Sequence, residues 1–357
     1  MSENILDEID VARPLVARYH RGFGAPVRLR WELTHAADLP PADSPSRPAR
    51  RDPRELSSVE CLALIDDFER TPVSHVEIGG GEPAVRDDFW DLLDYATGRH
   101  LSVEFCTSGT RLTPAAASRI ATNGHVNVRI SLDGTTEAAN DAVRGRGSYR
   151  TAVRAMELLA SSGVYDFEIS VRVTRHNVAQ LDGFLAIADL FGAQLRLNLP
   201  RPSQRDAAAK GDPHSTPQQQ PALYRWLREH AEQVRTGDSF LSLAGDCETL
   251  PGSISGDVGQ VVCVIDPIGD VYARRLVGYD DSSAGNIRAP GGFERIWRSS
   301  DLLTGVPGDQ VVVAADRAGA PRSPVDHSHP VHAATTISAR TRHKTPRAGF
   351  TAPERNV

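Results

Sequence analysis

The chain has 357 residues, of which 40% are hydrophobic and 24% are charged, and its formal net charge is −6. This length is enough for one large domain or two ordinary ones with a true hydrophobic core. No segment approaches the roughly eighteen apolar residues of a spanning helix, and the N-terminal stretch MSENILDEIDVARPL is too acidic and polar for a signal peptide. We therefore expect a cytoplasmic protein that binds neither membrane nor nucleic acid.

Short apolar segments alternate with helical patterns between residues 27 and 205. We expect strands at 27–33, 75–80, 101–106, 125–134, 167–174 and 193–199. We expect helices at 54–70, 87–100, 113–124, 148–163 and 177–192, where apolar residues recur at helical spacing. Six repeated βα units predict a parallel sheet. Right-handed connections allow either an open doubly wound sheet or a partial barrel, and the pattern alone leaves both open.

Changes in composition divide the chain into five parts. These are an N-terminal extension at 1–26, the βα region at 27–205, a linker rich in Pro and Gln at 206–221, an extension at 222–313 and a tail at 314–357. The extension at 222–313 is expected to contain a helix at 222–234, a hairpin at 259–273 and a short helix at 291–303. The tail has few large apolar residues, so we expect it to be disordered.

The stretch IGGGEPAVRDDF lies where the second strand should end and its helix should begin. In a parallel α/β protein this edge of the sheet is where ligands bind. Gly79, Gly80 and Gly81 let the backbone approach a ligand closely, and Glu82 supplies a carboxylate that can hold an ammonium group. The alternative interpretation is a tight turn without a ligand.

The cysteines Cys61, Cys106, Cys247 and Cys263 lie far apart and form no C-x-x-C pair. Their spacing predicts neither a disulfide framework nor a thiolate metal site. We expect reduced, partly buried thiols and no metal site.

Several short motifs resemble those of the radical S-adenosylmethionine (SAM) enzymes: W-E-L-T at 31–34, G-G-G-E-P at 79–83, C-T-S-G at 106–109, S-L-D-G at 131–134, R-G-R-G-S-Y at 144–149 and V-T-R-H-N at 173–177. Further stretches are similar to the mycofactocin-type maturases of the SPASM subfamily: R-D-P-R-E-L at 51–56, D-F-W-D-L-L-D-Y-A-T at 88–97, N-V-A-Q-L-D at 177–182 and V-I-D-P-I-G-D-V-Y-A at 264–273. The resemblance extends from about residue 27 to 303. It implies an α/β fold, a partial (βα)6 barrel followed by a SPASM-like extension.

The resemblance also implies a [4Fe–4S] cluster held by a C-x3-C-x2-C motif in the loop after the first strand, where the cluster cleaves SAM to a radical. Laid on this sequence without gaps, the three cysteine positions fall on Ala37, Pro41 and Ser44. None of these supplies the soft thiolate that iron–sulfur clusters need. The positions of the auxiliary-cluster cysteines fall on Arg274 and near Gly256. We therefore expect the cluster ligands to be absent.

If SAM still binds, the resemblance assigns its amino group to the loop Gly79–Glu82. Its ribose and methionyl parts are assigned to polar groups at the ends of the fourth and fifth strands. Ser131 is the best match, with Asp133 and Asn177 as weaker ones. The family's Asn in T-N-G is Ser108 here.

Our main hypothesis is a cluster-less homologue of a radical SAM peptide maturase that binds a peptide or SAM without radical chemistry. A precursor peptide and a separate peptide-recognition protein are the implied partners. Three alternatives stay open: a true radical maturase whose sequence is in error at the cysteine regions, a barrel adapted to non-radical chemistry, and a decayed gene product.

Overall fold

The structure is a computed structural model that describes residues 29–39, 50–71, 73–200, 215–216, 218–236, 261–275, 281–300 and 303. The chain divides into two compact units, residues 1–311 and 312–357, and all described residues belong to the first. The predicted N-terminal extension and tail, and most of the predicted linker, lie outside the described residues. In the part described, no helix is long and apolar enough to cross a membrane.

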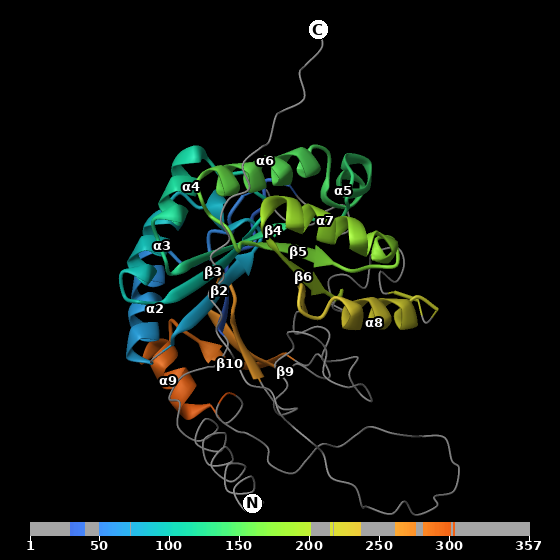
Figure 1. The fold of residues 1–357 in the computed structure, drawn as a ribbon. Coiled ribbons are helices and arrows are strands. Elements are labelled where there is room, and N and C mark those ends of the chain that lie inside the picture. Colours follow the sequence, from blue (N-terminus) through green and yellow to red (C-terminus); the bar gives the residue numbers. More distant parts are fainter. Residues whose placement is uncertain are drawn as a thin grey trace, which may run out of the picture. The chain divides into compact units, whose positions relative to one another are not determined.

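A curved parallel sheet forms the centre of the first unit, and helices cover its outer face (Figure 1). Six neighbouring strands follow chain order: β1 (Leu29–Thr34), β2 (His75–Gly80), β3 (Ser102–Thr107), β4 (Val126–Ser131), β5 (Glu168–Arg172) and β6 (Gln194–Asn198). The connecting helices are α2 (Ser58–Arg70), α3 (Phe89–Thr97), α4 (Pro114–Ala121), α5 (Glu137–Arg144), α6 (Ser148–Ser161) and α7 (Leu181–Phe191), with short 3-10 turns η1 (Pro83–Val85) and η2 (Val178–Gln180). The predicted partial (βα)6 barrel is confirmed.

The sheet continues beyond these six strands at both edges. After α8 (Gln220–Glu229), the short strand β7 (Val234–Thr236) pairs in parallel with β6. On the other side, β8 (Val261–Ile265) pairs in parallel with β1. It is followed by two antiparallel strands, β9 (Asp270–Arg275) and β10 (Asp281–Asn286), and then by α9 (Gly292–Ser299). The predicted hairpin and both predicted helices of the extension are therefore present, but β7 and β10 were not predicted.

Local sequence signals explain where several helices begin. Ser57 and Glu60 form a capping box that starts α2, in which each side chain bonds the backbone N–H of the other. Thr113 and Thr136 cap α4 and α5 by accepting backbone hydrogen bonds. These caps fix the residue at which each helix begins and therefore where the preceding loop ends.

An aromatic cluster joins the extension to the barrel. Phe68 of α2 packs edge to face against Trp31 of β1, at 5.9 Å between ring centroids, and against Phe293 of α9, at 5.4 Å. All three side chains are buried. Such pairs add to the energy of burying large apolar surfaces, so α9 is part of the same core as the barrel.

The inner face of the barrel carries a layer of charged side chains, one from each of the strands β1 to β7. We call this the charge layer; its members are Arg30, Glu77, Glu104, Arg129, Glu168, Arg196 and Arg235. Arg129 is central because it forms ion pairs with Glu77 at 3.0 Å, with Glu168 at 3.1 Å and with Glu104. The layer crosses the interior below the carboxyl ends of the strands.

Candidate ligand-binding site

The predicted glycine loop follows β2 and lies against the backbone that follows β1. The N–H of Gly81 donates to the carbonyl of Thr34 at 2.7 Å, and the N–H of Glu82 donates to the carbonyl of Ala36 at 2.8 Å. A Cβ at position 81 would lie 1.9 Å from the Ala36 carbonyl oxygen, and Gly80 has φ of 105°. These glycines are therefore required by contact with the chain itself. Their approach to a ligand stays a prediction.

Glu82 follows β2, and its carboxylate lies against the end of β3. It is buried, with 2% of the residue exposed. Its Oε1 accepts a hydrogen bond from Thr107 Oγ1 at 2.8 Å, and its Oε2 accepts from the backbone N and Oγ of Ser108 at 2.7 and 2.6 Å. Burial raises the pKa of Glu82, and these hydrogen bonds only partly offset that effect. Among the described residues no cationic side chain forms an ion pair with it, so a ligand cation would complete the site.

A small pocket opens at the carboxyl ends of the strands beside Ser108. It is lined by Leu39, Ser108, Ser131, Arg144 and Ser148. Three hydroxyl groups and one guanidinium therefore meet there, a set that suits a carboxylate or the hydroxyl groups of a sugar. The predicted residue Ser131 is in this lining.

Arg144 and Ser148 belong to the R-G-R-G-S-Y motif, but the sequence analysis did not assign them a binding role. Arg144 ends α5 and pairs with Asp133 at 2.8 Å, which aims its guanidinium at the carboxyl ends of the strands. Ser148 begins α6, where its hydroxyl donates to Asp141 at 3.0 Å. The one sequence signal for Arg144 is that it follows the fourth strand, which ends at Ser131, within the same βα unit.

The two weaker predictions, Asp133 and Asn177, lie near the pocket but bond to other parts of the chain. Asp133 accepts from the backbone N of Arg172 at 2.8 Å and pairs with Arg144. The amide of Asn177 donates to the carbonyls of Asp133 and Arg172 at 3.0 and 2.9 Å, and accepts from the N of Thr174 at 2.7 Å. Both side chains fix the loops after β4 and β5, and their contact with a ligand stays a prediction.

The predicted cluster positions lie in the loop after β1. Ala37 is buried, with 5% of the residue exposed, whereas Pro41 and Ser44 lie outside the described residues. The sequence has no cysteine between Met1 and Glu60. A loop without thiolates there does not fit a cluster held by three cysteines.

The cysteines that the structure describes lie elsewhere. Cys61 is buried on α2, where its thiol contacts the Leu56 carbonyl at 3.9 Å, and burial raises its pKa to about 12. Cys263 is buried on β8, and burial raises its pKa as well. Cys106 is partly exposed on β3, with its sulfur 3.4 Å from Ser131 Oγ. Among the described residues no three His, Cys, Asp or Glu side chains are grouped to hold a metal ion.

The two positions predicted for auxiliary-cluster cysteines supply no thiolate. Arg274 lies on β9, and Gly256 lies outside the described residues.

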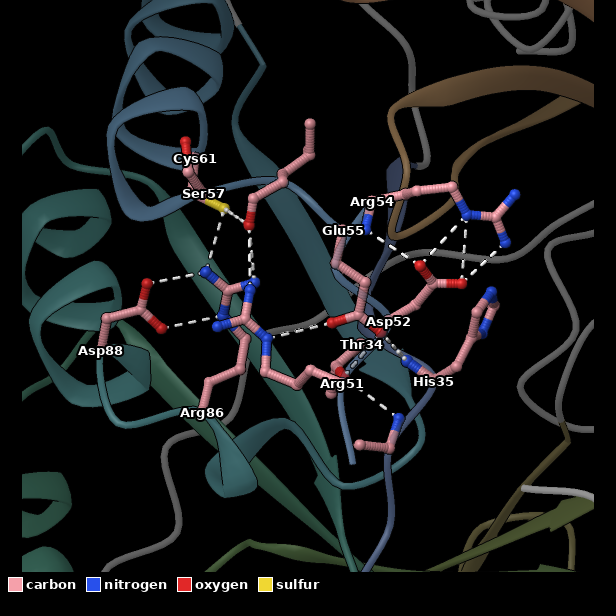
Figure 2. Close-up of polar contacts among 12 residues, drawn as sticks. Thr34, His35, Arg51, Asp52, Arg54, Glu55, Ser57, Cys61, Arg86 and Asp88 are labelled. Carbon is pink, nitrogen blue, oxygen red and sulfur yellow. Dashed lines mark hydrogen bonds and ion pairs between the residues drawn. The ribbon is translucent and has the colours of Figure 1, made fainter. Parts of the chain in front are cut away.

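The base of the loop after β1 is held by polar contacts among the charged residues of R-D-P-R-E-L and their neighbours, which Figure 2 shows. Glu55 bonds the end of β1 on one side and Arg51 on the other, and Arg86 bonds the carbonyl of Leu56 at 2.9 Å. Sequence reasoning used this stretch only for its resemblance and missed its structural role.

Comparison with known proteins agrees with this geometry. The model of the radical SAM superfamily matches residues 36–178. The mycofactocin maturase MftC of Mycolicibacterium smegmatis is 49% identical over 293 residues, which cover 81% of this chain and 74% of that protein.

Solved structures show the same fold. Streptococcus suis SuiB bound to S-adenosylmethionine superposes with a TM-score of 0.64 at 14% identity, over 86% of this chain and 74% of that one. SuiB bound to its precursor peptide SuiA gives a TM-score of 0.62 at 14% identity, over 87% and 73%. The fold with its glycine loop and the near-half identity to MftC lead to one conclusion: the chain belongs to the mycofactocin maturase family of the radical SAM superfamily.

Proposed function

We propose that this protein acts in mycofactocin-type peptide maturation by binding SAM or a peptide at the carboxyl ends of the barrel strands, without radical chemistry of its own. The observation that carries the proposal is the buried carboxylate of Glu82, which has only neutral partners among the described residues. A buried anion without a cation costs free energy that an incoming ammonium group recovers.

The rest of the pocket suits the remainder of an α-amino acid. Ser108 connects Glu82 to the pocket, and Arg144 lies in the same lining with Ser131 and Ser148. An ammonium near Glu82 and a carboxylate near Arg144 would match the zwitterionic end of SAM or a peptide terminus. Both solved structures of SuiB named above carry such a molecule, SAM in one and a precursor peptide in the other.

Calorimetric titration with SAM tests this binding. We expect heat of binding for the wild-type protein and an affinity lower by about 10- to 100-fold for Glu82→Gln, the loss typical of a hydrogen bond to a charged group. Asp87→Asn is the matched control, because Asp87 is exposed in the same segment. Equal affinities of wild type and Glu82→Gln, or no binding by wild type, would contradict the proposal.

The proposal excludes radical chemistry because the loop after β1 lacks the side chains that would hold an iron–sulfur cluster. The loop that would carry the cluster contains Ala37, Pro41 and Ser44 at the family positions, and its carboxylate oxygens, those of Asp38 and Asp43, are hard ligands. Asp38 is also engaged, since Arg111 donates to it at 2.6 and 3.0 Å.

A second candidate function is that of an ordinary radical SAM maturase, and the relatives favour it. An identity of 49% over 81% of the chain is a level at which an activity is usually shared. This candidate requires the cysteines that the family pattern places at 37, 41 and 44. Resequencing the gene separates the two candidates: recovered cysteines would establish the maturase function, and an unchanged sequence would leave the binding function.

A further inference from the structure

A single buried carboxylate holds both ends of the loop that follows β1 (Figure 2). The side chain of Glu55 is fully buried, at 0% exposure. Its Oε1 accepts hydrogen bonds from Thr34 Oγ1 at 3.0 Å and from the N–H of His35 at 2.9 Å, and its Oε2 accepts from Arg51 Nε at 3.1 Å. Glu55 therefore joins the end of β1 to the segment that returns from the loop.

The returning segment is itself anchored on two sides. The carbonyl of Leu56 accepts from Arg51 Nη2 at 3.1 Å and from Arg86 Nη1 at 2.9 Å, and Asp88 holds Arg86 through two bonds of 2.8 and 2.7 Å. The N–H of Leu56 donates to the carbonyl of Pro267, in the turn between β8 and β9, at 2.8 Å. Glu55 is thus fixed to a rigid frame rather than to a free loop.

From Glu55 an unbroken series of hydrogen bonds leads to the pocket. Thr34 Oγ1 accepts from the N–H of Ala36 at 3.1 Å, and the carbonyl of Ala36 accepts from the N–H of Glu82 at 2.8 Å. The carboxylate of Glu82 then holds Ser108, whose side chain lines the pocket. A shift at the end of β1 would therefore move the group that is proposed to bind the ligand.

We propose that Glu55 is the positioning residue of the ligand pocket: it fixes the backbone after β1 against the glycine loop and so sets the place of Glu82. Its role in affinity rests on the proposed function, whereas its role in positioning does not. Glu55 does not line the pocket. A carboxylate suits the task because its two oxygens accept from donors on both sides of the loop at once.

Residue-resolved amide hydrogen exchange of the ligand-free protein tests the positioning. In Glu55→Ala, exchange should accelerate about tenfold or more at His35, Ala36, Gly81 and Glu82, the effect of about one lost hydrogen bond in a buried site. Glu55→Gln keeps one side-chain oxygen for His35 and Thr34, so it should restore protection at these amides. The control Asp52→Ala removes a carboxylate of the same segment that bonds Arg54 and should change none of them.

Equal acceleration at every amide of Glu55→Ala, unchanged exchange at the four amides, or no recovery in Glu55→Gln would overturn the proposal. If Glu55→Ala does not fold, Thr34→Val decides: it should accelerate Ala36 and Glu82 and leave the α2 amides unchanged. The same variants are titrated with SAM, and we expect Glu55→Ala to bind about tenfold more weakly than Asp52→Ala. If wild type binds no SAM, the proposed function fails, and the exchange pattern alone decides the role of Glu55.

Discussion

Two sets of buried carboxylates inside the barrel differ in the partners they have. In the charge layer each carboxylate faces arginine: Glu77 pairs with Arg30 at 3.7 Å and Arg129 at 3.0 Å, and Glu168 pairs with Arg129 and Arg235, each at 3.1 Å. Where the strands end, Glu82 accepts only from hydroxyl and amide groups.

The difference suits a structural role for the charge layer and the proposed ligand-binding role for Glu82. The charge layer is neutralised within the chain and needs no ligand, because every buried acid there has a cation. The site around Glu82 differs, since burial raises the pKa of Glu82 and, among the described residues, no cationic side chain forms an ion pair with its carboxylate. Substitutions in the two regions should therefore have different signatures.

The largest effect is expected in the charge layer for Arg129→Met. This change leaves Glu77, Glu104 and Glu168 without their shared cation, and breaking a buried ion pair costs about 3–5 kcal/mol. Denaturant unfolding measures the loss. Arg154→Met, on the exposed face of α6, is the control and should stay within about 0.5 kcal/mol of wild type.

A smaller loss, of about 2–4 kcal/mol, is expected for Gly81→Ala at the end of β2, since the new Cβ would lie 1.9 Å from the Ala36 carbonyl oxygen. The displaced loop should also lose SAM binding. Gly124→Ala is matched, because nothing lies within 4 Å of its Cβ. Similar unfolding midpoints for the two variants would show that the close approach of the two loops is not needed.

The pH dependence of Glu77 sharpens the comparison further. Burial alone would raise its pKa, but the charges of Arg30 and Arg129 outweigh burial and lower the pKa to about 2. A lowered folded-state pKa stabilises the protein above the ordinary value of 4.5, and this stability is lost as pH falls toward 2. Glu77→Gln should therefore cost about 3 kcal/mol at pH 7 and much less near pH 2, as denaturant unfolding at both pH values would show.

The smallest effect is expected for Glu82→Gln without ligand, and its sign is opposite. Because the folded-state pKa is raised, the contribution of Glu82 to stability is complete below its ordinary value of 4.5 and is lost as pH rises through the raised pKa. The melting temperature of Glu82→Gln should therefore be slightly higher than that of wild type at pH 7 and equal to it at pH 4. A variant that melts lower at pH 7 would place Glu82 with the structural carboxylates.

Much of the fold could be predicted because its signals are local. Apolar runs such as LSVEFC and helical spacing such as that of 54–70 are visible within a few residues. The strands β7 and β10 were missed because VRT and DSSAGN carry no apolar run, and they become strands only by pairing with β6 and β9.

The site was only partly predictable, for the same reason. The glycine loop follows the second strand at the expected edge of the sheet, so its position identified it, whereas Ser131, the last residue of β4, was identified by the family resemblance. The place of Arg144 depends on an ion pair with Asp133 across a turn, and the role of Glu55 depends on Thr34, which is 21 residues away. Sequence spacing does not show such contacts.

One measurement shows most directly whether the family's cluster has been lost: anaerobic reconstitution with iron and sulfide, followed by iron analysis and, after chemical reduction to the paramagnetic [4Fe–4S]+ state, electron paramagnetic resonance. The triple variant Ala37→Cys, Pro41→Cys, Ser44→Cys is treated in parallel to supply the family's ligands. We predict that the wild-type chain assembles no [4Fe–4S] cluster while the triple variant does. A stoichiometric, SAM-responsive cluster in the wild-type protein would contradict this and make it a radical maturase.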